Sequence, residues 1–323
     1  MDNRLITICI PTFRRPDLLV EAIQTCFQQN YRPLEILIGD DSMDEKSFDL
    51  TRGLALPSGV TLSHVVHPTS LKQARNVSWL FSNAAGSRLT LLHDDDGFLP
   101  HGLDKLVAAW DVAPNVVCAY GKFEIVSAEG ALLPDDTVRH NALYGRVSSA
   151  AGLQESALTA ALTQQLPHNG YLVSTELARS VLYRTEQEVG NSGDVDFGIR
   201  LAIAAGEGKF SFIDEFLSFY RQTANSILRT RRGNYGHHLL YEKMIQLPIP
   251  RQDRAAHDLL LRRMSALAVL SAAMAGKRKQ AIAILCSKHY SLRYTDVRTA
   301  FRLAYIASPH LGDMLNNLLP ASR

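Results

Sequence analysis

The sequence predicts an α/β fold, with a mainly parallel sheet covered by helices on both faces and a helical region at the C-terminal end. Apolar strand patterns alternate with amphipathic helix patterns up to residue 126. Polar clusters directly follow three of these predicted strands, and only helical periodicity is present from Tyr235 onward. Of the 323 residues, 46% are hydrophobic and 20% are charged, which is typical of a soluble globular protein.

The alternation begins with an apolar run at 5–10, which we expect to end at Pro11. In the next segment, 16–29, apolar residues recur at helical spacing, and Pro16 suits the first position of a helix. The other elements predicted in this part are strands at 34–38, 60–66, 88–92 and 116–126 and helices at 71–85 and 101–111. Such alternation favours parallel pairing, because each helix carries the chain back across a face of the sheet.

The periodicity is weaker beyond residue 126. The elements expected there are a helix at 154–163, a helix at 196–205 and one or two strands at 210–220, with loops elsewhere in 127–167. From Tyr235 onward we expect helices, interrupted by the two prolines of 247–250. The polar stretch 229–234 is the predicted boundary between a domain at 1–228 and a helical region at 229–323.

Charge divides the chain at the same place. Residues 1–228 contain 18 Lys and Arg against 27 Asp and Glu, a balance of −9, whereas residues 229–323 contain 16 against 5, a balance of +11. The basic positions of the second part include Arg251, Arg254, Arg262, Arg263, Lys277, Arg278 and Lys279. They form either solvated helix faces or a surface for an anionic membrane. The lack of regularly interleaved aromatic residues, together with the acidic first domain, argues against a nucleic acid partner.

Cysteine usage and the N-terminal segment indicate the compartment. Four scattered cysteines without a Cys-x-x-Cys pair favour free thiols in a reducing environment and argue against a zinc cluster. Met1 leads into the first predicted strand without the pattern of a secretion signal, and the most apolar later stretch, 264–275, is too short to span a bilayer. We therefore expect a cytoplasmic protein, whose basic region would attach it peripherally to the inner face of a membrane.

Three adjacent carboxylates, Asp94, Asp95 and Asp96, follow the predicted strand 88–92. Neighbouring carboxylates raise one another's pKa unless a cation neutralises them. Asp oxygens suit Mg²⁺ or Mn²⁺, which can in turn bind the phosphate oxygens of a nucleotide. The alternative is a solvated acidic turn that caps the next helix. Because polar clusters also follow other strands, at 11–14 and 40–41, and ligands bind at the carboxyl ends of such strands, we favour a ligand site.

Four segments occur in a fixed order, reading ICIPTFRRP at 8–16, LEILIGDDS at 34–42, LKQARN at 71–76 and LLHDDD at 91–96, with Pro100 after the last. Together they resemble the large family of inverting glycosyltransferases called family 2, which has the GT-A fold. The resemblance is strong over about 4–105 and thinner up to about 228. It implies a GT-A domain that binds a nucleotide-sugar with the help of a divalent metal ion.

The resemblance also implies roles for matching residues. The positions implied in nucleotide binding are Pro11, Thr12, Phe13, Arg14, Asp41, Lys72, Arg75, Asp94 and Asp95. Asp41 would accept a hydrogen bond from a pyrimidine ring N–H, and Arg75 would lie near the diphosphate, with a surface ion pair as its alternative role. Asp95 and Asp96 would hold Mn²⁺ or Mg²⁺, although many relatives have Asp where this chain has His93.

The segment GDVDFGIRL at 193–201 resembles the part of the family that carries the catalytic base. Asp194 matches the carboxylate that deprotonates the acceptor hydroxyl, while Gly193 replaces the usual Glu. The alternative for Asp194 is a helix N-cap.

Two positions later in the predicted domain are weaker candidates for the acceptor or diphosphate side. Arg221 belongs to a segment similar to the family's Tyr-Arg-x-His, with Thr223 in place of the His. Its side chain would reach phosphate or pack on the sheet edge. His168 lies in the region expected to face the acceptor, where a structural role is the alternative.

We therefore expect a metal-dependent hexosyltransferase that moves a sugar from a UDP-sugar to a hydroxyl of a glycan or lipid-linked acceptor, with inversion, as in polysaccharide biosynthesis. One alternative is a nucleotidyltransferase, but the 11–14 segment is not the Gly-rich phosphate loop that such an enzyme would need near its first strand. The other is a degenerate relative that binds nucleotide or glycan as a scaffold, which Gly193 and Thr223 keep open.

Overall fold

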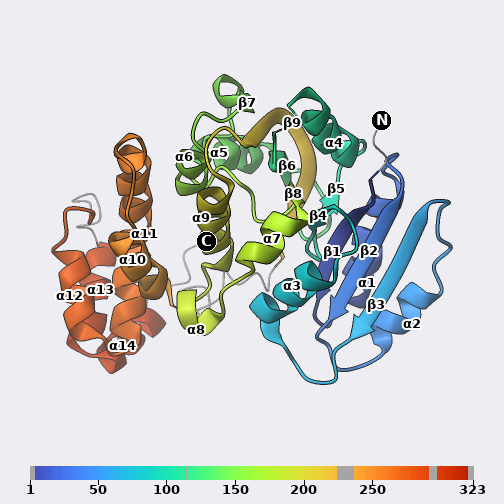
Figure 1. The fold of residues 1–323 in the computed structure, drawn as a ribbon. Coiled ribbons are helices and arrows are strands. Elements are labelled where there is room, and N and C mark those ends of the chain that lie inside the picture. Colours follow the sequence, from blue (N-terminus) through green and yellow to red (C-terminus); the bar gives the residue numbers. More distant parts are fainter. Residues whose placement is uncertain (1–3, 114, 224–235, 291–296, 319–323) are drawn as a thin grey trace. The chain divides into compact units, whose positions relative to one another are not determined.

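The structure, a computed structural model, describes residues 4–113, 115–223, 236–290 and 297–318 (Figure 1). The chain forms two compact units. The first unit comprises residues 1–184 and 197–224, and the second comprises 185–196 and 225–323. The predicted boundary stretch, 229–234, lies outside the described residues, so a boundary at that place stays a prediction.

A nine-stranded sheet forms the centre of the first unit, in the order β3-β2-β1-β4-β8-β6-β9-β5, with β7 paired to β9. The strands are β1 (Ile6–Thr12), β2 (Leu34–Asp40), β3 (Val60–Val66), β4 (Arg88–Leu91), β5 (Gly97–Phe98), β6 (Cys118–Val126), β7 (Gly152–Leu153), β8 (Leu172–Ser174) and β9 (Phe210–Arg221). The four strands from β3 to β4 are parallel, whereas β8 is antiparallel to both of its neighbours. The sheet is therefore mixed, and its longest pairings are parallel.

The predicted end of the first strand at Pro11 is wrong. β1 continues to Thr12, and Pro11 and Thr12 pair with Gly39 and Asp40 of β2. Pairing of β1 with β4 already ends at Cys9 opposite Leu91. Proline is tolerated here because the side of β1 that faces β4 no longer needs a backbone donor.

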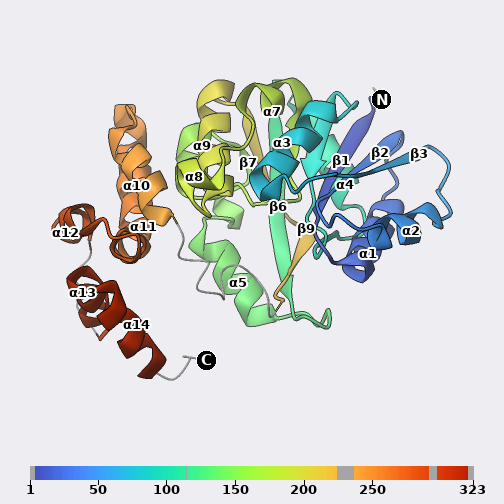
Figure 2. The ribbon, with the colours of Figure 1, turned by 90° about the horizontal axis from the view of Figure 1, so that it is seen from below.

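Helices cover both faces of the sheet, as the alternation predicted. The helices of the first unit are α1 (Pro16–Phe27), α2 (Lys46–Arg52), α3 (Lys72–Asn83), α4 (Gly102–Val112), α5 (Pro134–Leu143), α6 (Ala157–Leu162) and α7 (Thr175–Val181). A short 3₁₀ turn at Ser148–Ala150 lies between α5 and α6. Helix α9 (Gly193–Ala205) begins in the second unit and ends in the first. Figure 2 shows α3 on one face of β1–β3 and α1 and α2 on the other. The buried side chains Ile6, Ile8 and Ile10 of β1 belong to the apolar core that includes α1 and α4. This alternation in β1 follows from the two-residue period of a strand.

Glycine at position 39 allows α3 to approach β2 closely. A Cβ atom there would lie 2.2 Å from Oδ1 of Asn76. The Asn76 amide donates to the carbonyl oxygen of Gly39 at 2.7 Å, and its oxygen lies 3.0 Å from Nε2 of His67. The asparagine of the LKQARN segment therefore anchors the helix to the strand.

Several short elements are absent from the expectations. The segment 127–167 contains α5 in addition to the expected helix, so the prediction of one helix there is wrong. The expected one or two strands at 210–220 form one strand of 12 residues, β9. The strands β5, β7 and β8 are two or three residues long and pair with partners far along the chain. Such lengths are too short for a hydrophobic period to be recognised.

The second unit is helical within its described residues. Its helices are α8 (Glu186–Val189), α10 (His237–Gln246), α11 (Arg254–Met274), α12 (Arg278–Leu285), α13 (Val297–Ala307) and α14 (Pro309–Leu318), with a 3₁₀ turn at Arg251–Asp253. Consecutive helices α10, α11 and α12 pack against each other, as do α13 and α14. Among the described residues, no helix combines the length and the apolar character needed to cross a bilayer.

Candidate donor and metal site

The carboxyl ends of β1, β2 and β4 meet at one edge of the sheet, because these strands are parallel neighbours. The two strands on the other side of β4 add residues to the same edge. β8 runs antiparallel to β4, so the segment that precedes it arrives there, and Gly170 N donates to the carbonyl oxygen of Leu91 at 2.8 Å. β9 runs in the direction of β4 and ends at Arg221. The topology thus brings His168 and Arg221 to the three aspartates.

Asp94 and Asp95 face the last residue of β1 and the residues that follow it. The hydroxyl of Thr12 donates to Oδ2 of Asp94 at 2.7 Å, and Phe13 N donates to the same oxygen at 3.3 Å. Arg15 Nη1 donates to Asp94 at 3.1 Å and to Asp95 at 2.6 Å. Burial raises the pKa of Asp94 to about 6 despite the opposing charge of Arg15. Burial and then the charge of Asp96 raise the pKa of Asp95.

Asp96 has a different set of neighbours. One carboxylate oxygen accepts a hydrogen bond from Arg221 N at 2.9 Å, and the other accepts one from the Asn169 side chain. His168 Nε2 lies 3.6 Å from that second oxygen. Asp96 and Asn169 are both buried. The residue at the end of β9 thus holds one carboxylate oxygen, and a residue just before β8 holds the other.

Three side chains in this region could hold a metal ion: His93, Asp96 and His168. Each offers one ligand atom, and these atoms lie within 4.8 Å of one another. The Nε2 atom of His93 is buried without a hydrogen-bond partner among the described residues, and a metal ion would give it one. Two imidazoles and one carboxylate are an established ligand set for divalent metals. The residues therefore fit a metal ion.

This group overlaps only partly with the predicted metal ligands. Asp96 belongs to it, whereas the carboxylate of Asp95 forms an ion pair with Arg15 at 2.6 Å. His168 lies beside Asp96, and its expected place on the acceptor or diphosphate side stays a prediction. The predicted role of Asp95 as a metal ligand stays a prediction that requires this ion pair to rearrange.

The end of β1 and the loop after it carry the residues expected around the nucleotide base. Phe13 is half exposed, and the guanidinium of Arg14 lies over its ring, 5.1 Å from the centroid. Arg14 also adopts a left-handed backbone conformation, with φ of 56°, and its N–H donates to Ser42 Oγ at 2.7 Å. Pro11 is half-buried, and Thr12 is buried with its hydroxyl committed to Asp94. Phe13 and Arg14 are thus exposed to solvent, whereas Thr12 contacts Asp94.

Asp41 is buried and holds the start of α3. Its Oδ1 accepts from Leu71 N at 2.6 Å, and its Oδ2 accepts from Ser70 Oγ at 2.6 Å and Lys72 N at 2.9 Å. Two of these bonds satisfy free backbone donors at the helix start, which is the task of an N-cap, although Asp41 is 30 residues away from Leu71. A carboxylate accepts about four hydrogen bonds, so one position remains for a base N–H.

Lys72 and Arg75 lie on the exposed side of the first turns of α3. Arg75 forms no ion pair with any residue that the structure describes, so the alternative of a surface ion pair has no support. The positive charges of both side chains are free to meet an anion in solution.

The remaining predicted residues are placed as follows. Asp194 lies in the first turn of α9, directly after its first residue Gly193, and its role as catalytic base or helix cap stays a prediction. Arg221 is 8% exposed, and its guanidinium donates to the carbonyl oxygens of Asp95 and Ala128 and to Glu21. These contacts fix the Arg221 side chain beside the three aspartates, and a contact with phosphate stays a prediction. Thr223 Oγ1 is buried and has no hydrogen-bond partner in the described part of the chain.

Sequence reasoning missed Arg15 and Asn169 as members of the site. Arg15 directly follows the segment expected to bind the base, and this position could have suggested a place in the site. Asn169 gave no such signal, because its contact with Asp96 spans 73 residues and depends on the direction of β8.

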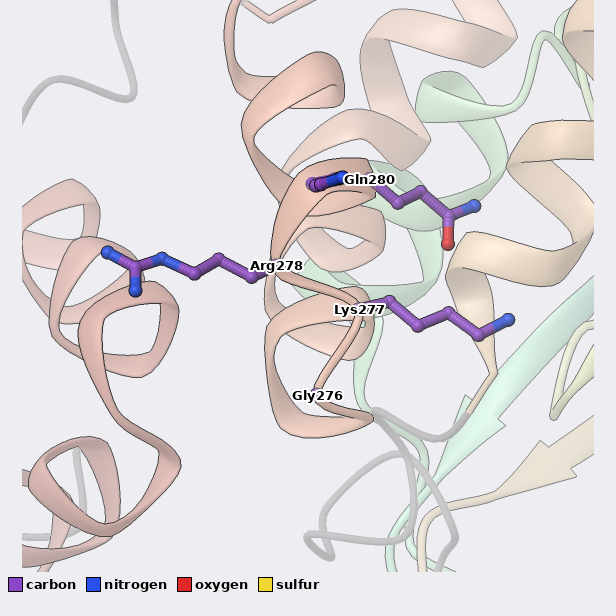
Figure 3. A pocket seen from close by; sticks show the side chains of 5 residues that line it. Gly276, Lys277, Arg278 and Gln280 are labelled. Atoms are coloured by element: carbon purple, nitrogen blue, oxygen red, sulfur yellow. The ribbon is translucent and has the colours of Figure 1, made fainter.

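In the second unit, a surface depression of about 400 Å³ lies at the turn between α11 and α12, lined by residues 276–280. Figure 3 shows the side chains of Lys277 and Arg278 pointing in opposite directions from this turn. Diverging cations do not converge on one small anion, and they suit contact with an extended charged surface instead.

Residues 7–145 match the profile of glycosyl transferase family 2. No curated protein matches the chain in sequence. Staphylococcus aureus TarS 1–349 in complex with UDP-GlcNAc has a TM-score of 0.62 at 12% identity, over 95% of this chain and 92% of TarS 1–349. The mannosyltransferase PcManGT from Pyrobaculum calidifontis, in complex with GDP-Man and Mn²⁺, has a TM-score of 0.59 at 17% identity, over 96% and 88% of the two chains. At these identities the similarity to solved structures shows a shared fold.

Proposed function

The chain carries a family 2 glycosyltransferase domain with the GT-A fold, and from this premise we propose that it transfers a sugar from a UDP-sugar to a hydroxyl group of a glycan or lipid-linked acceptor. The observation that carries the proposal is the cluster of Asp94, Asp95 and Asp96 at the strand edge, next to the open surface of Phe13 and Arg14. Such a site offers a stacking surface for a base and acidic ligands for a cation that binds a diphosphate.

The donor class is supported by the solved structures that share the fold. TarS 1–349 is seen with UDP-GlcNAc, and PcManGT is seen with GDP-Man and Mn²⁺. We choose UDP for this chain because the remaining acceptor position on Asp41 suits the single ring N–H of uracil. Lys72 and Arg75, both exposed on α3, would neutralise the diphosphate.

A divalent metal ion, when bound, would supply positive charge to the departing diphosphate. Among the described side chains, His93, Asp96 and His168 would hold this ion. Transfer with inversion needs a base to remove the proton of the acceptor hydroxyl as its oxygen attacks the anomeric carbon. We assign this task to Asp194, in the first turn of α9.

The test combines binding with turnover. UDP should raise the Tm of the protein more in Mn²⁺ than in EDTA, since ligand binding stabilises the native state by mass action. Release of UDP from UDP-sugars in the presence of acceptor should then fall roughly 10²–10⁴-fold in the Asp194→Asn variant, while the UDP-induced shift is retained. UDP binding without any turnover, across a panel of sugars and acceptors, would favour the scaffold alternative.

The basic second unit supports a further part of the proposal, a peripheral contact with an anionic membrane that would carry a lipid-linked acceptor. Residues 229–323 have a balance of +11, and side chains at the α11–α12 turn diverge across the surface. Each basic residue near an anionic leaflet contributes about 1 kcal/mol to the free energy of membrane binding.

The membrane contact can be tested by sedimentation with vesicles. The protein should sediment with anionic vesicles at low salt, be released at about 1 M salt, and not bind neutral vesicles. Replacing Lys277, Arg278 and Lys279 by Gln should weaken sedimentation and leave UDP binding intact. A protein that stays in solution with anionic vesicles at low salt would contradict the membrane contact.

A further inference from the structure

We propose that His93, Asp96 and His168 form a metal centre that contains nitrogen ligands and selects Mn²⁺, Co²⁺ or Zn²⁺ over Mg²⁺ and Ca²⁺. This inference deepens the proposed function by naming the class of cation. It rests on that function only for the role of the metal in sugar transfer. The ligand set also differs from an all-aspartate site, because two of its three members are imidazoles.

The three ligand atoms are nearly at coordination spacing. All of them lie within 4.8 Å of one another, and the Nε2 atom of His168 is 3.6 Å from the nearer oxygen of Asp96. Metal–ligand bonds of about 2.1 Å place neighbouring ligand atoms roughly 3–4 Å apart. Small side-chain rotations therefore suffice to bring the atoms around one ion.

The surroundings hold the ligands in this arrangement. Asp96 is fixed through one oxygen by Arg221 N and through the other by Asn169. The ring of His168 packs against Tyr220 and Phe123, with centroids 5.1 and 5.7 Å apart. Contacts of this kind orient metal ligands and reduce the conformational entropy that binding would otherwise cost.

Arg15 pairs with the other two aspartates. Its Nη1 atom donates to Asp94 and Asp95, so a resident cation already compensates part of their negative charge. Asp96 lacks an ion pair with Arg or Lys among the described residues. The side chain best placed to accept a metal ion is thus the one that also has histidine neighbours.

The ligand chemistry determines the selectivity. Mg²⁺ and Ca²⁺ are hard cations that prefer oxygen ligands. Mn²⁺, Co²⁺ and Zn²⁺ also bind imidazole nitrogen, Mn²⁺ less strongly than the other two. Replacement of carboxylates by imidazoles should therefore lower affinity for Mg²⁺ relative to the transition metals. It also lowers the net negative charge of the site.

The experiment titrates Mn²⁺ into the full chain without nucleotide and follows bound Mn²⁺ by electron paramagnetic resonance. We expect one tight site, little competition from a tenfold excess of Mg²⁺, and electron spin-echo modulation from directly bound ¹⁴N. His93→Phe and His168→Phe should each weaken Mn²⁺ binding by about tenfold or more and remove part of the ¹⁴N signal. His101→Asn is the matched control, because His101 is exposed and Asn tolerates its left-handed backbone.

Each alternative result is distinct. Bound Mn²⁺ without a ¹⁴N signal, or loss of binding in Asp95→Asn with normal binding in both Phe variants, would overturn the proposal and place the metal on the aspartates. The wild-type spin-echo result does not depend on a variant, so it decides the matter even if a Phe variant is unfolded in a melting control. Because no nucleotide is present, failure of the metal centre is separate from failure of UDP binding or sugar transfer.

Discussion

The two ends of the acidic triplet are adjacent in sequence, yet they lie in different surroundings. Asp94 and Asp95 are bonded to residues at the end of β1 and just after it, among them Arg15. Asp96 is bonded to residues at the end of β9 and before β8 and has two histidines beside it. One end is therefore paired with a cation of the protein itself, and the other has side chains that could receive an external cation.

This difference teaches that three like residues in a row need not act as one ligand set. Successive side chains after a strand point in different directions, so each meets a different neighbouring segment. A motif of consecutive aspartates thus indicates a charged edge, and the partners of each carboxylate decide its task. Four experiments can break or sharpen the comparison.

The largest effect is expected for Asp96→Asn. The amide removes the negative charge at the metal-binding end and leaves the Asn169 amide facing another NH₂ group. We expect kcat/KM for sugar transfer to fall by about 100-fold or more, since a bound metal ion contributes several kcal/mol of transition-state stabilisation. Steady-state kinetics and Mn²⁺ titration check this together. An active variant with normal Mn²⁺ affinity would contradict the assignment of Asp96.

Asp41→Asn tests a carboxylate on the other side of the site. The change should lower the free energy of unfolding by about 1–3 kcal/mol, because one amide oxygen cannot replace the two oxygens that hold Ser70, Leu71 and Lys72. Urea denaturation measures the stability, and calorimetry measures UDP affinity on the same sample. Unchanged stability with weaker UDP binding would make Asp41 a base-binding residue without a structural role.

A third prediction concerns His140, whose ring contacts Phe123, which in turn contacts His168. Burial and then the charge of Arg146 lower the pKa of His140 to about 3, and Nδ1 of His140 accepts from Nη2 of Arg146 at 3.1 Å. In the unfolded chain a histidine has a pKa of about 6.5 and binds a proton that the folded state resists. The free energy of unfolding should therefore fall as pH is lowered from about 6.5 toward 3.

The control for this pH dependence is a variant series. His140→Phe should flatten the decline in stability between pH 7 and pH 4 in urea denaturation, whereas His101→Asn, at an exposed site, should leave it as in the wild type. Identical slopes in the wild type and in His140→Phe would show that the histidine titrates normally in the folded protein.

The smallest effect is expected for Arg15→Gln on metal affinity. If Asp94 and Asp95 do not bind the ion, removal of their cation should change the Mn²⁺ dissociation constant by no more than about threefold, through a long-range charge effect. A second Mn²⁺ ion bound by the variant would show that Arg15 competes with metal for these carboxylates. In that case the two ends of the triplet would be interchangeable.

The sequence alone determined the parallel half of the fold and the position of the charged edge. Strong periodicity predicted β2, β3, α1, α3 and α4 close to their observed bounds, because long amphipathic patterns are set by local geometry. The four ordered motifs were also enough to predict the family that the profile match supports. These features depend on residues that are near one another in the chain.

Only the tertiary structure decided how the charged edge is divided. His168 and Asn169 reach Asp96 because β8 runs antiparallel beside β4, a direction that three residues of strand do not encode locally. Arg15 pairs with Asp94 and Asp95 across 79 and 80 residues because β1 and β4 are neighbours in the sheet. The physical reason is that pairing of distant strands, rather than any local preference, determines which side chains meet a carboxylate.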